Sequence, residues 1–318
     1  MAELNIKQAH SSSLHDLRGV VAVVTGGASG IGNMITTALL SNGATVFIID
    51  QNESLVQSVT KIYNEAAQTA NLPGRLIGLV GDISKKSEAK RLADEVGKQA
   101  PYVTVLFNNA GILEGTFVPP TSGKAADFVE AYFDKVPEET FDRTLRVNAF
   151  GPYWLTFAFL PLLEKWKEHG FGDEGRKFPP QVIMTSSMNG WTKDSNTAGR
   201  SYPYIFSKAA IGQATSTLAR ELLPLGVRVN GIAPGLFVSG MSVPGSADAS
   251  GQSFSKNNDH PFAVPTPQLP EELGGPSNVG GSRRDVASLV LFLLSNWYVN
   301  GETVLIDGGT LLVHASSY

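Results

Sequence analysis

Tyr204 and Lys208 are the residues whose types and spacing most directly indicate chemistry. They lie four positions apart in Tyr204-Ile205-Phe206-Ser207-Lys208, where helical periodicity begins, so both side chains should lie on one face of a helix. A phenol has a pKa of about 10 and is a poor base at neutral pH, but a neighbouring ammonium group favours the phenolate. The pair could therefore carry a proton to or from a substrate. By itself, this spacing is common and more often marks a solvated helix face.

A glycine-rich segment near the amino end could bind a nucleotide. Gly26, Gly30 and Gly32 follow the apolar run Val20–Thr25 and open the helical stretch Ile31–Ser41. In such a segment one glycine allows the tight turn, one lets the backbone approach a pyrophosphate, and one lets helix pack against strand. The amides at the helix start then face the anion. Glycines also serve ordinary turns, but this position between a strand and a helix favours nucleotide binding.

Asp50 is the candidate selector of the nucleotide. It ends the apolar run Ala44–Asp50, where a carboxylate can accept hydrogen bonds from both ribose hydroxyls of an adenosine and repels a 2′-phosphate. Neither Ser29 nor Gln51 supplies the cation that a phosphorylated ribose needs. This pattern favours NAD over NADP. The alternative is that Asp50 only caps the following helix, and Asp82, which ends the third strand, has the same alternative.

Strand-like and helix-like stretches alternate along the chain and must position these residues. Short apolar runs rich in β-branched residues indicate strands that are buried on both faces of a parallel sheet. These runs are Val20–Thr25, Ala44–Asp50, Arg75–Gly81, Val103–Phe107, Gln181–Ser186, Val227–Ile232 and Thr303–Ile306. The helical stretches are Ile31–Ser41, Leu55–Ala70, Lys85–Gln99, Phe141–Lys167, Phe206–Leu223 and Arg284–Ser295. The alternation predicts an α/β fold, a doubly wound, Rossmann-like, mostly parallel seven-stranded sheet with helices on both faces.

The chain shows no internal repeat and no linker that would divide it. We therefore expect a polar amino-terminal extension over residues 1–18 and a single Rossmann-like domain over residues 19–318. Insertions near residues 113–137 and 237–282 interrupt the alternation, and the first contains a helical piece, Ala125–Phe133. A long loop in a compact domain is usually either functional or a disordered insert.

Composition excludes several classes of function. The 318 residues include 25 Lys+Arg and 29 Asp+Glu, for a net charge of −4, so no basic surplus exists to bind nucleic acid. Without cysteine, the chain forms no disulfide, thiolate nucleophile or cysteine-ligated metal site, and the five scattered histidines lack metal-ligand spacing. The first 18 residues have no apolar core, and no apolar run approaches the roughly 20 residues that cross a bilayer. We expect a cytoplasmic protein without membrane contact or a metal.

Further short motifs occur in a fixed order around these residues. In order, the full set is Thr25-Gly26-x-x-x-Gly30-x-Gly32, Asp82, Asn108-Asn109-Ala110-Gly111, Asn148, Ser187, Tyr204-x-x-x-Lys208, Asn230 and Pro234-Gly235. Together they resemble the motifs of the short-chain dehydrogenase/reductase family, of the single-domain type. The resemblance covers about residues 19–309.

The resemblance implies four catalytic residues. Tyr204 would exchange a proton with the substrate hydroxyl or carbonyl, and Lys208 would lower the pKa of Tyr204 and hold the nicotinamide ribose. Ser187 would hydrogen-bond to the substrate oxygen. Asn148 would fix a water molecule that connects Lys208 to bulk solvent. Ser187 matches the family pattern better than Ser186 because a glycine follows three residues on, which leaves Ser186 as a candidate backbone partner.

The resemblance also implies which residues hold NAD. They are Gly26, Ser29, Gly30, Ile31, Gly32, Asp50, Asp82, Ile83, Asn109, Ala110, Gly111, Tyr204, Lys208, Pro234, Gly235, Phe237 and Ser239. Ser239 stands where the family usually has threonine, so the hydroxyl is kept.

The expected substrate is a medium-sized, largely apolar secondary alcohol or ketone, interconverted by hydride transfer. Candidate lining residues, whose alternative role is core packing, are Met188, Trp191, Phe237, Met241 and Phe254. The gap between Ser187 and Tyr204 is a few residues longer than the family's, and we expect residues 192–200 to bulge at the pocket mouth.

Two alternative functions and an oligomeric state complete the expectations. The chain could be an NADP-dependent carbonyl reductase, or a relative that binds NAD as a sensor or scaffold without turnover. Tyr202 is a second phenol, but it lacks a lysine four residues on. The resemblance implies a homodimer or homotetramer through the helical stretches Phe141–Lys167 and Phe206–Leu223.

Overall fold

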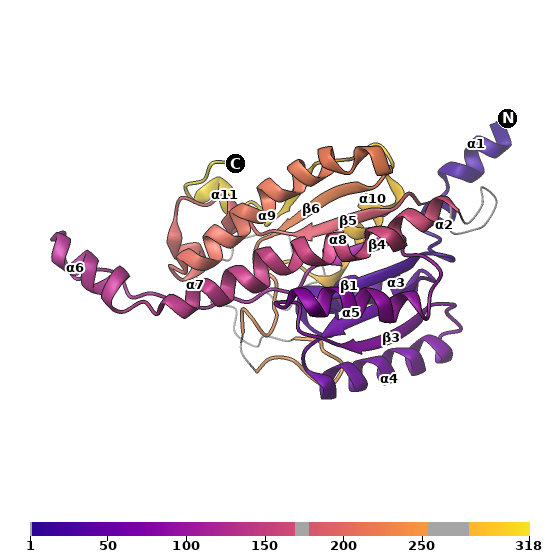
Figure 1. Ribbon diagram of the computed structural model, residues 1–318. Helices are drawn as coiled ribbons and strands as arrows, with labels where there is room; N and C mark the ends of the chain where they lie inside the picture. The colour runs from indigo at the N-terminus through magenta and orange to yellow at the C-terminus, as the bar shows by residue number, and fades with distance from the viewer. Residues whose placement is uncertain (1, 169–177, 244, 254–279) are drawn as a thin grey trace.

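A sheet of seven parallel strands forms the centre of the structure (Figure 1). The computed structural model describes residues 2–168, 178–243, 245–253 and 280–318. The strands are β1 (Val21–Thr25), β2 (Thr45–Asp50), β3 (Arg75–Val80), β4 (Val105–Asn108), β5 (Gln181–Thr185), β6 (Arg228–Pro234) and β7 (Thr303–Ile306). Their order is β3-β2-β1-β4-β5-β6-β7. The predicted fold class is confirmed.

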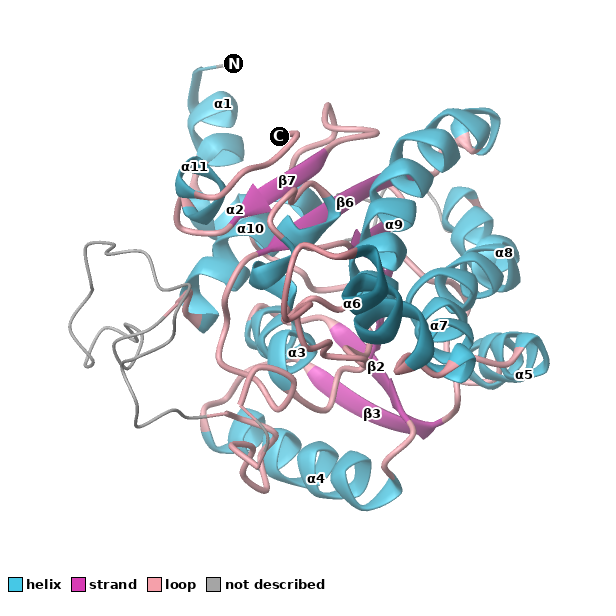
Figure 2. Cartoon of the chain, turned by 90° about the vertical axis from the view of Figure 1, so that its left-hand side faces the viewer, coloured by secondary structure: helices cyan, strands magenta, loops and turns pink. Residues whose placement is uncertain are grey.

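Two layers of helices cover the faces of this sheet (Figure 2). One layer contains α3 (Gly30–Ser41), α4 (Glu53–Thr69) and α10 (Arg283–Ser295), and the other contains α5 (Lys86–Gly97), α8 (Gly151–Glu164) and α9 (Tyr202–Glu221). Alternate side chains of a strand enter opposite layers, so Ala22 and Val24 of β1 pack with the first group and Val21 and Val23 with the second. All residues of β1 are buried, as expected for a strand inside a parallel sheet.

The strand order reverses between β1 and β4. β1 pairs with β2 on one side and with β4 on the other, and the chain winds away from this point in both directions. In open parallel sheets, ligands bind where the strand ends diverge at such a reversal. The glycine segment after β1 and the Asn109 region after β4 both lie at this point.

The long helical stretch predicted over Phe141–Lys167 is confirmed, but it is not α-helical throughout. The structure has α7 (Glu138–Leu145), then a π turn over Arg146–Phe150, then α8, and a 3-10 turn over Lys165–Lys167. A π turn adds one residue to a helical turn without ending the helix, so the stretch still reads as one helix in the sequence. Such turns are frequent at functional sites, and this one carries Asn148.

Helix α9 begins at Tyr202, four residues before the predicted start at Phe206. Pro203 lies in its first turn, where proline is favoured because that amide has no partner within the helix. The side chain of Ser201 caps the helix by accepting a hydrogen bond from the amide of Tyr204 (3.4 Å). The whole Tyr204–Lys208 unit is therefore helical.

The predicted extension and insertions have structure of their own. The extension forms α1 (Ala2–Ala9) and α2 (Ser11–Leu14), and Leu17 at its end is fully buried in the core. The helical piece of the first insertion is confirmed as α6 (Ala125–Val129) with a π turn over Glu130–Asp134, and it extends away from the sheet (Figure 1). Most of the insertion at residues 237–282 lies outside the described residues. Among the helices described, none is both long and apolar enough to span a membrane.

Candidate functional site

The side chains of Tyr204 and Ser187 meet beyond the carboxyl end of β5. Ser187 begins a 3-10 turn, and its Oγ accepts a hydrogen bond from the amide of Asn189 (3.1 Å). Tyr204 lies in the first turn of α9 and is only 7% exposed. Burial raises the pKa of Tyr204, whereas its hydrogen bond with Ser187 acts in the opposite direction. The phenol therefore holds its proton near pH 7 and is placed to donate it.

Lys208 lies beneath the Tyr204 ring. Its Nζ is 5.6 Å from the ring centroid and donates a hydrogen bond to the carbonyl oxygen of Thr185 (2.8 Å). Burial lowers the pKa of Lys208 to about 8, so most molecules keep the ammonium form near pH 7. The sequence led us to expect that Lys208 lowers the pKa of Tyr204. In the protein alone, burial of the phenol is the larger effect, and the net direction is upward.

Asn148 holds the loop after β4 next to Lys208. Its Oδ1 accepts from the amide of Ile112 and its Nδ2 donates to the Ile112 carbonyl oxygen, both at 2.8 Å. The same Nδ2 donates to Oγ of Ser207 (3.0 Å). A Cβ atom at Gly111 would stand 3.2 Å from Asn148 Oδ1 and 3.4 Å from Lys208 Nζ, so the two polar groups border one small space. Asn148 thus links the β4 loop to α9, a contact that its type and position in the sequence did not reveal.

The choice of Ser187 over Ser186 agrees with the contacts of the two hydroxyls. Ser186 donates its hydroxyl to the backbone carbonyl oxygen of Lys208 (2.8 Å), as expected for a backbone partner. A Cβ atom at Gly190 would lie 2.9 Å from the same carbonyl oxygen. The glycine three residues after Ser187 therefore allows the turn to pack closely against α9.

The glycine segment forms a cradle that no larger residues could form. Gly26 and Gly30 have φ angles of +63° and +51°, which favour glycine. A Cβ atom at Gly32 would be 2.0 Å from the carbonyl oxygen of Gly26, and one at Gly30 would be 3.0 Å from Cβ of Ser239. Ser29 precedes α3 without capping it through its side chain. The cradle and the first amides of α3 fit the phosphates of a dinucleotide.

Thr25 fixes the Asn109 loop beside this cradle. Its Oγ1 accepts hydrogen bonds from the amides of Asn109 and Ala110 (both 3.0 Å) and donates to the carbonyl oxygen of Phe107 (3.2 Å). The Asn109 Nδ2 donates to the Thr25 carbonyl oxygen (3.0 Å). The structure thus brings together the predicted Asn109-Ala110-Gly111 segment and the glycine segment. The sequence did not lead us to predict these contacts of Thr25. The feature that could have indicated them is a hydroxyl side chain at the end of a buried strand.

Asp50 does not cap the following helix, so that alternative is wrong. The cap of α4 is Asn52, whose side chain accepts from the amide of Leu55 (3.1 Å). Burial raises the pKa of Asp50, and hydrogen bonds from the amides of Asn52 and Gln51 partly oppose this. The carboxylate at the end of β2 fits the ribose of an adenosine.

Asp82 is not a helix cap either, because α5 begins at Lys86 with Lys85 as its cap residue. Asp82 instead forms a turn in which its carboxylate accepts from the amide (3.1 Å) and hydroxyl (2.7 Å) of Ser84 and lies 3.1 Å from Nζ of Lys85. Burial tends to raise the pKa of Asp82, but these hydrogen bonds together lower it. Ile83 is buried in the layer that contains α5.

The remaining predicted residues follow β6. A Cβ atom at Gly235 would be 2.6 Å from Cα of Asp307, so only glycine lets Pro234-Gly235 pass β7. Ser239 lies against Gly30. Phe237 is buried in the core that contains α3 and α10, so its ring packs in the core rather than lining a pocket.

The other candidate lining residues differ in exposure. Met188 is buried, Met241 is 44% exposed, and the Trp191 ring contacts the ring of Tyr318 with centroids 4.9 Å apart. Phe254 lies outside the described residues. Within the described part of the chain, no three His, Asp or Glu side chains are grouped to hold a metal ion.

Comparison with known proteins assigns the family. The family model described as short chain dehydrogenase matches residues 20–249. The chain belongs to the short-chain dehydrogenase/reductase family. This confirms the resemblance drawn from the order of its motifs.

Individual relatives extend over nearly the whole chain. The short-chain dehydrogenase/reductase PhomF of Diaporthe leptostromiformis is 32% identical over 97% of this chain and 97% of its own length. The 3-oxoacyl-[acyl-carrier-protein] reductase FabG of Thermotoga maritima is 26% identical, over 93% of this chain and 99% of its own. Among solved structures, the active-site complex of Pseudomonas aeruginosa RhlG with NADP has a TM-score of 0.68 at 26% identity, over 93% of this chain and 98% of that one.

Proposed function

We propose that this protein is an NAD-dependent oxidoreductase that interconverts a secondary alcohol and a ketone, with Tyr204 as the acid and base. The observation that carries the proposal is the meeting of the Tyr204 and Ser187 hydroxyls above Lys208, next to the glycine cradle. When bound, the nicotinamide ring supplies or accepts the hydride. The other catalytic work falls to side chains of the chain itself.

In the direction of reduction, Tyr204 donates its phenolic proton to the substrate oxygen as negative charge develops there. Ser187 donates a second hydrogen bond to the same oxygen and stabilises that charge. In the direction of oxidation, the phenolate of Tyr204 accepts the proton from the alcohol. The ammonium group of Lys208 then stabilises the phenolate, and Asn148 holds the water that returns the proton to solvent.

The preference for NAD rests on Asp50. Its carboxylate lies at the end of β2, and neither Ser29 nor Gln51 offers a cation to a 2′-phosphate. The second candidate is an NADP-dependent carbonyl reductase, which is favoured by the similarity to the structure of the RhlG complex with NADP. Titration with NADH and NADPH, followed by energy transfer from the four tryptophans, separates the two. Tighter binding of NADPH would contradict the proposal, and binding of neither would remove the claim of enzyme activity.

The role of Tyr204 is tested by Tyr204→Phe, measured against a panel of secondary alcohols and ketones that the wild-type protein turns over. We expect kcat to fall by about 10³-fold or more, because the proton carrier is lost, while the Kd for NADH stays within about twofold. Tyr202→Phe is the matched control and should retain turnover. Retained turnover in Tyr204→Phe would contradict the assignment. A wild-type protein that binds NADH but turns over no member of the panel would support the non-catalytic alternative.

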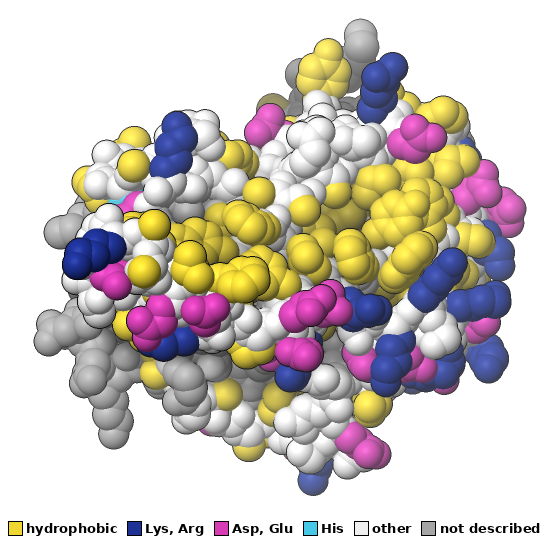
Figure 3. Space-filling model, turned by 60° about the vertical axis from the view of Figure 1, so that its left-hand side comes forward, with side chains coloured by type: hydrophobic (Ala, Val, Ile, Leu, Met, Phe, Trp, Pro, Cys, Tyr) yellow, Lys and Arg dark blue, Asp and Glu magenta, His cyan; other side chains and the backbone are white. Residues whose placement is uncertain are grey.

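We also propose a cytoplasmic homodimer or homotetramer whose domain spans residues 19–318. The association of copies is supported by a set of exposed aromatic side chains on the π turn, α8 and α9, namely Phe150, Tyr153, Phe157 and Phe206. Figure 3 shows a band of hydrophobic side chains across one face of the molecule. Burial of such a band between copies would remove apolar surface from water.

A further inference from the structure

The last residues of the chain pair with the segment that follows Ser187. Thr192 and Ser316 form an antiparallel bridge, and the amide of Lys193 donates to the carbonyl oxygen of Ala315 (2.7 Å). The segment between Ser187 and α9 is therefore bound by backbone pairing to residues near the carboxyl end of the chain.

Trp191 is fixed by the same pairing. Its carbonyl oxygen accepts hydrogen bonds from the amide (2.8 Å) and the hydroxyl (3.2 Å) of Ser317. Its ring contacts the ring of Tyr318, at an interplanar angle of 58°. Tyr318 is 67% exposed, so it covers Trp191 from the solvent side.

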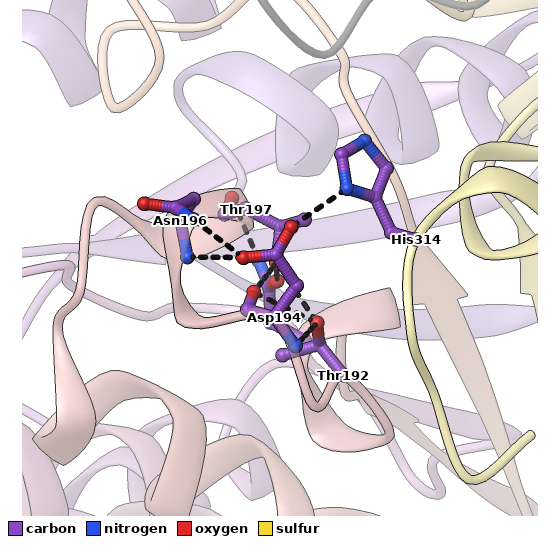
Figure 4. A network of polar contacts seen from close by, with 6 residues as sticks. Thr192, Asp194, Asn196, Thr197 and His314 are labelled. Carbon is purple, nitrogen blue, oxygen red and sulfur yellow. Dashed lines mark hydrogen bonds and ion pairs between the residues drawn. The ribbon is translucent and has the colours of Figure 1, made fainter.

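A polar network around Asp194, drawn in Figure 4, continues this contact. Nδ1 of His314 lies 2.8 Å from Oδ2 of Asp194, and the Asp194 carbonyl oxygen accepts from the amide of Thr197 (3.2 Å). The Thr197 hydroxyl is 2.6 Å from Oδ1 of Asn189, whose amide donates to Oγ of Ser187. Thr197 and Asn189 are both buried. Contacts therefore run without interruption from the carboxyl-terminal segment to Ser187.

The Trp191–Thr197 segment also leads directly to Tyr204. After the turn at residues 195–198, the chain meets the first insertion, where the amide of Phe117 donates to the carbonyl oxygen of Gly199 (3.2 Å). It then enters α9 two residues before Tyr204. A substrate oxygen placed between Ser187 and Tyr204 thus has this segment beside it.

We propose that the carboxyl-terminal residues His314–Tyr318 determine which substrates the enzyme accepts, because they position the Trp191–Thr197 segment beside Ser187 and Tyr204. The inference rests on the proposed function. His314 and Tyr318 act as positioning residues that need not touch the substrate. Bulky apolar substrates depend most on this segment, since they extend farthest from the reacting oxygen.

The test compares a variant that ends at Val313 and the milder Tyr318→Ala with the wild-type protein. Leu312→Ala is the matched control, because Leu312 precedes the pairing and is 90% exposed. The probes are 2-butanone, acetophenone and 4-phenyl-2-butanone, with the nicotinamide cofactor that the wild-type protein prefers. Amide hydrogen exchange of residues 188–201 provides a second measurement that does not depend on turnover.

We expect the truncated variant to change the kcat/KM ratio between the largest and smallest ketone by about tenfold, mainly through KM, while cofactor Kd stays within about twofold. Tyr318→Ala should shift the ratio in the same direction by less, and Leu312→Ala should not. Exchange of residues 188–201 should become faster in the truncated variant.

Two results would overturn the inference. The first is faster exchange with an unchanged ratio between ketones, and the second is unchanged exchange in both variants. If the truncated protein fails to fold, the ratio and exchange of Tyr318→Ala decide in the same way. A wild-type protein that reduces none of the ketones would contradict the proposed function instead. Amide hydrogen exchange alone would then decide whether the carboxyl-terminal residues hold the Trp191–Thr197 segment in place.

Discussion

The two halves of the candidate site are held by different kinds of contact. At the ends of β1 and β4, glycines permit close backbone approach and Thr25 bonds to the neighbouring strand end. Beyond β5, side chains and backbone of the Trp191–Thr197 segment bond to residues at the carboxyl end, such as Asp194 to His314, 120 positions apart. Both halves join distant segments, but those of the nucleotide half, such as Thr25 and Asn109, each belong to a short motif, whereas those of the substrate half belong to none. The first can be recognised from short motifs, but the second cannot.

The largest expected effect breaks the nucleotide half. In Gly32→Ala the added Cβ would lie 2.0 Å from the carbonyl oxygen of Gly26 and 2.6 Å from Nδ2 of Asn109, and backbone cannot move as a flexible side chain can. We expect a loss of about 3 kcal/mol in the free energy of unfolding, measured by urea denaturation, together with loss of NADH binding. Gly240→Ala, in the segment after β6, is the matched control, because nothing described lies within 4 Å of its Cβ position. Equal losses of stability and of NADH binding in the two variants would contradict the role given to Gly32.

The same distinction explains how much could be predicted from the sequence. The strands, the fold class and the spacing of Tyr204 and Lys208 follow from apolar runs and helical periodicity, which are local properties of the chain. The π turn that carries Asn148 was missed because the helix continues through it on both sides. The pairing of the Trp191–Thr197 segment with the carboxyl end was missed because a contact between distant segments leaves no periodic pattern in the sequence. The motif order indicated the chemistry, whereas the surroundings of the substrate depend on the fold.

Lys208 lies where the two halves join, and the pH dependence of stability tests its environment. Its pKa is lowered to about 8 by burial, below the roughly 10.4 of an unfolded chain. Between these values the unfolded chain binds a proton that the folded protein has released, so stability should rise with pH across this window. The slope contributed by one group is at most about 1.4 kcal/mol per pH unit.

Lys208→Met should remove this contribution, and urea midpoints at several pH values between about 8 and 10 would measure it. The variant should also lose turnover, since the phenolate of Tyr204 then lacks its stabilising charge. A slope that persists unchanged in Lys208→Met would mean that the ammonium group is not desolvated at the join between the halves. Loss of the slope in Lys208→Met would show that the buried position of Lys208 lowers the stability of the protein, as expected of a residue that serves catalysis.

The smallest expected effect sharpens the description of the substrate half. His314 holds the pKa of Asp194 below its ordinary value through their hydrogen bond, so this contribution to stability is present above about pH 4 and is lost as pH falls through the lower folded value. Both side chains are partly exposed, and the coupling in a double-mutant cycle of Asp194→Asn and His314→Gln should be below about 1 kcal/mol near pH 6. Thermal unfolding of the four proteins measures it. A coupling of this size is enough, because the backbone hydrogen bonds of Trp191 and Lys193 hold the same pairing. A coupling above about 2 kcal/mol would instead make the His314 contact the main support of the substrate half, and one that persisted below pH 3 would exclude the carboxylate as its origin.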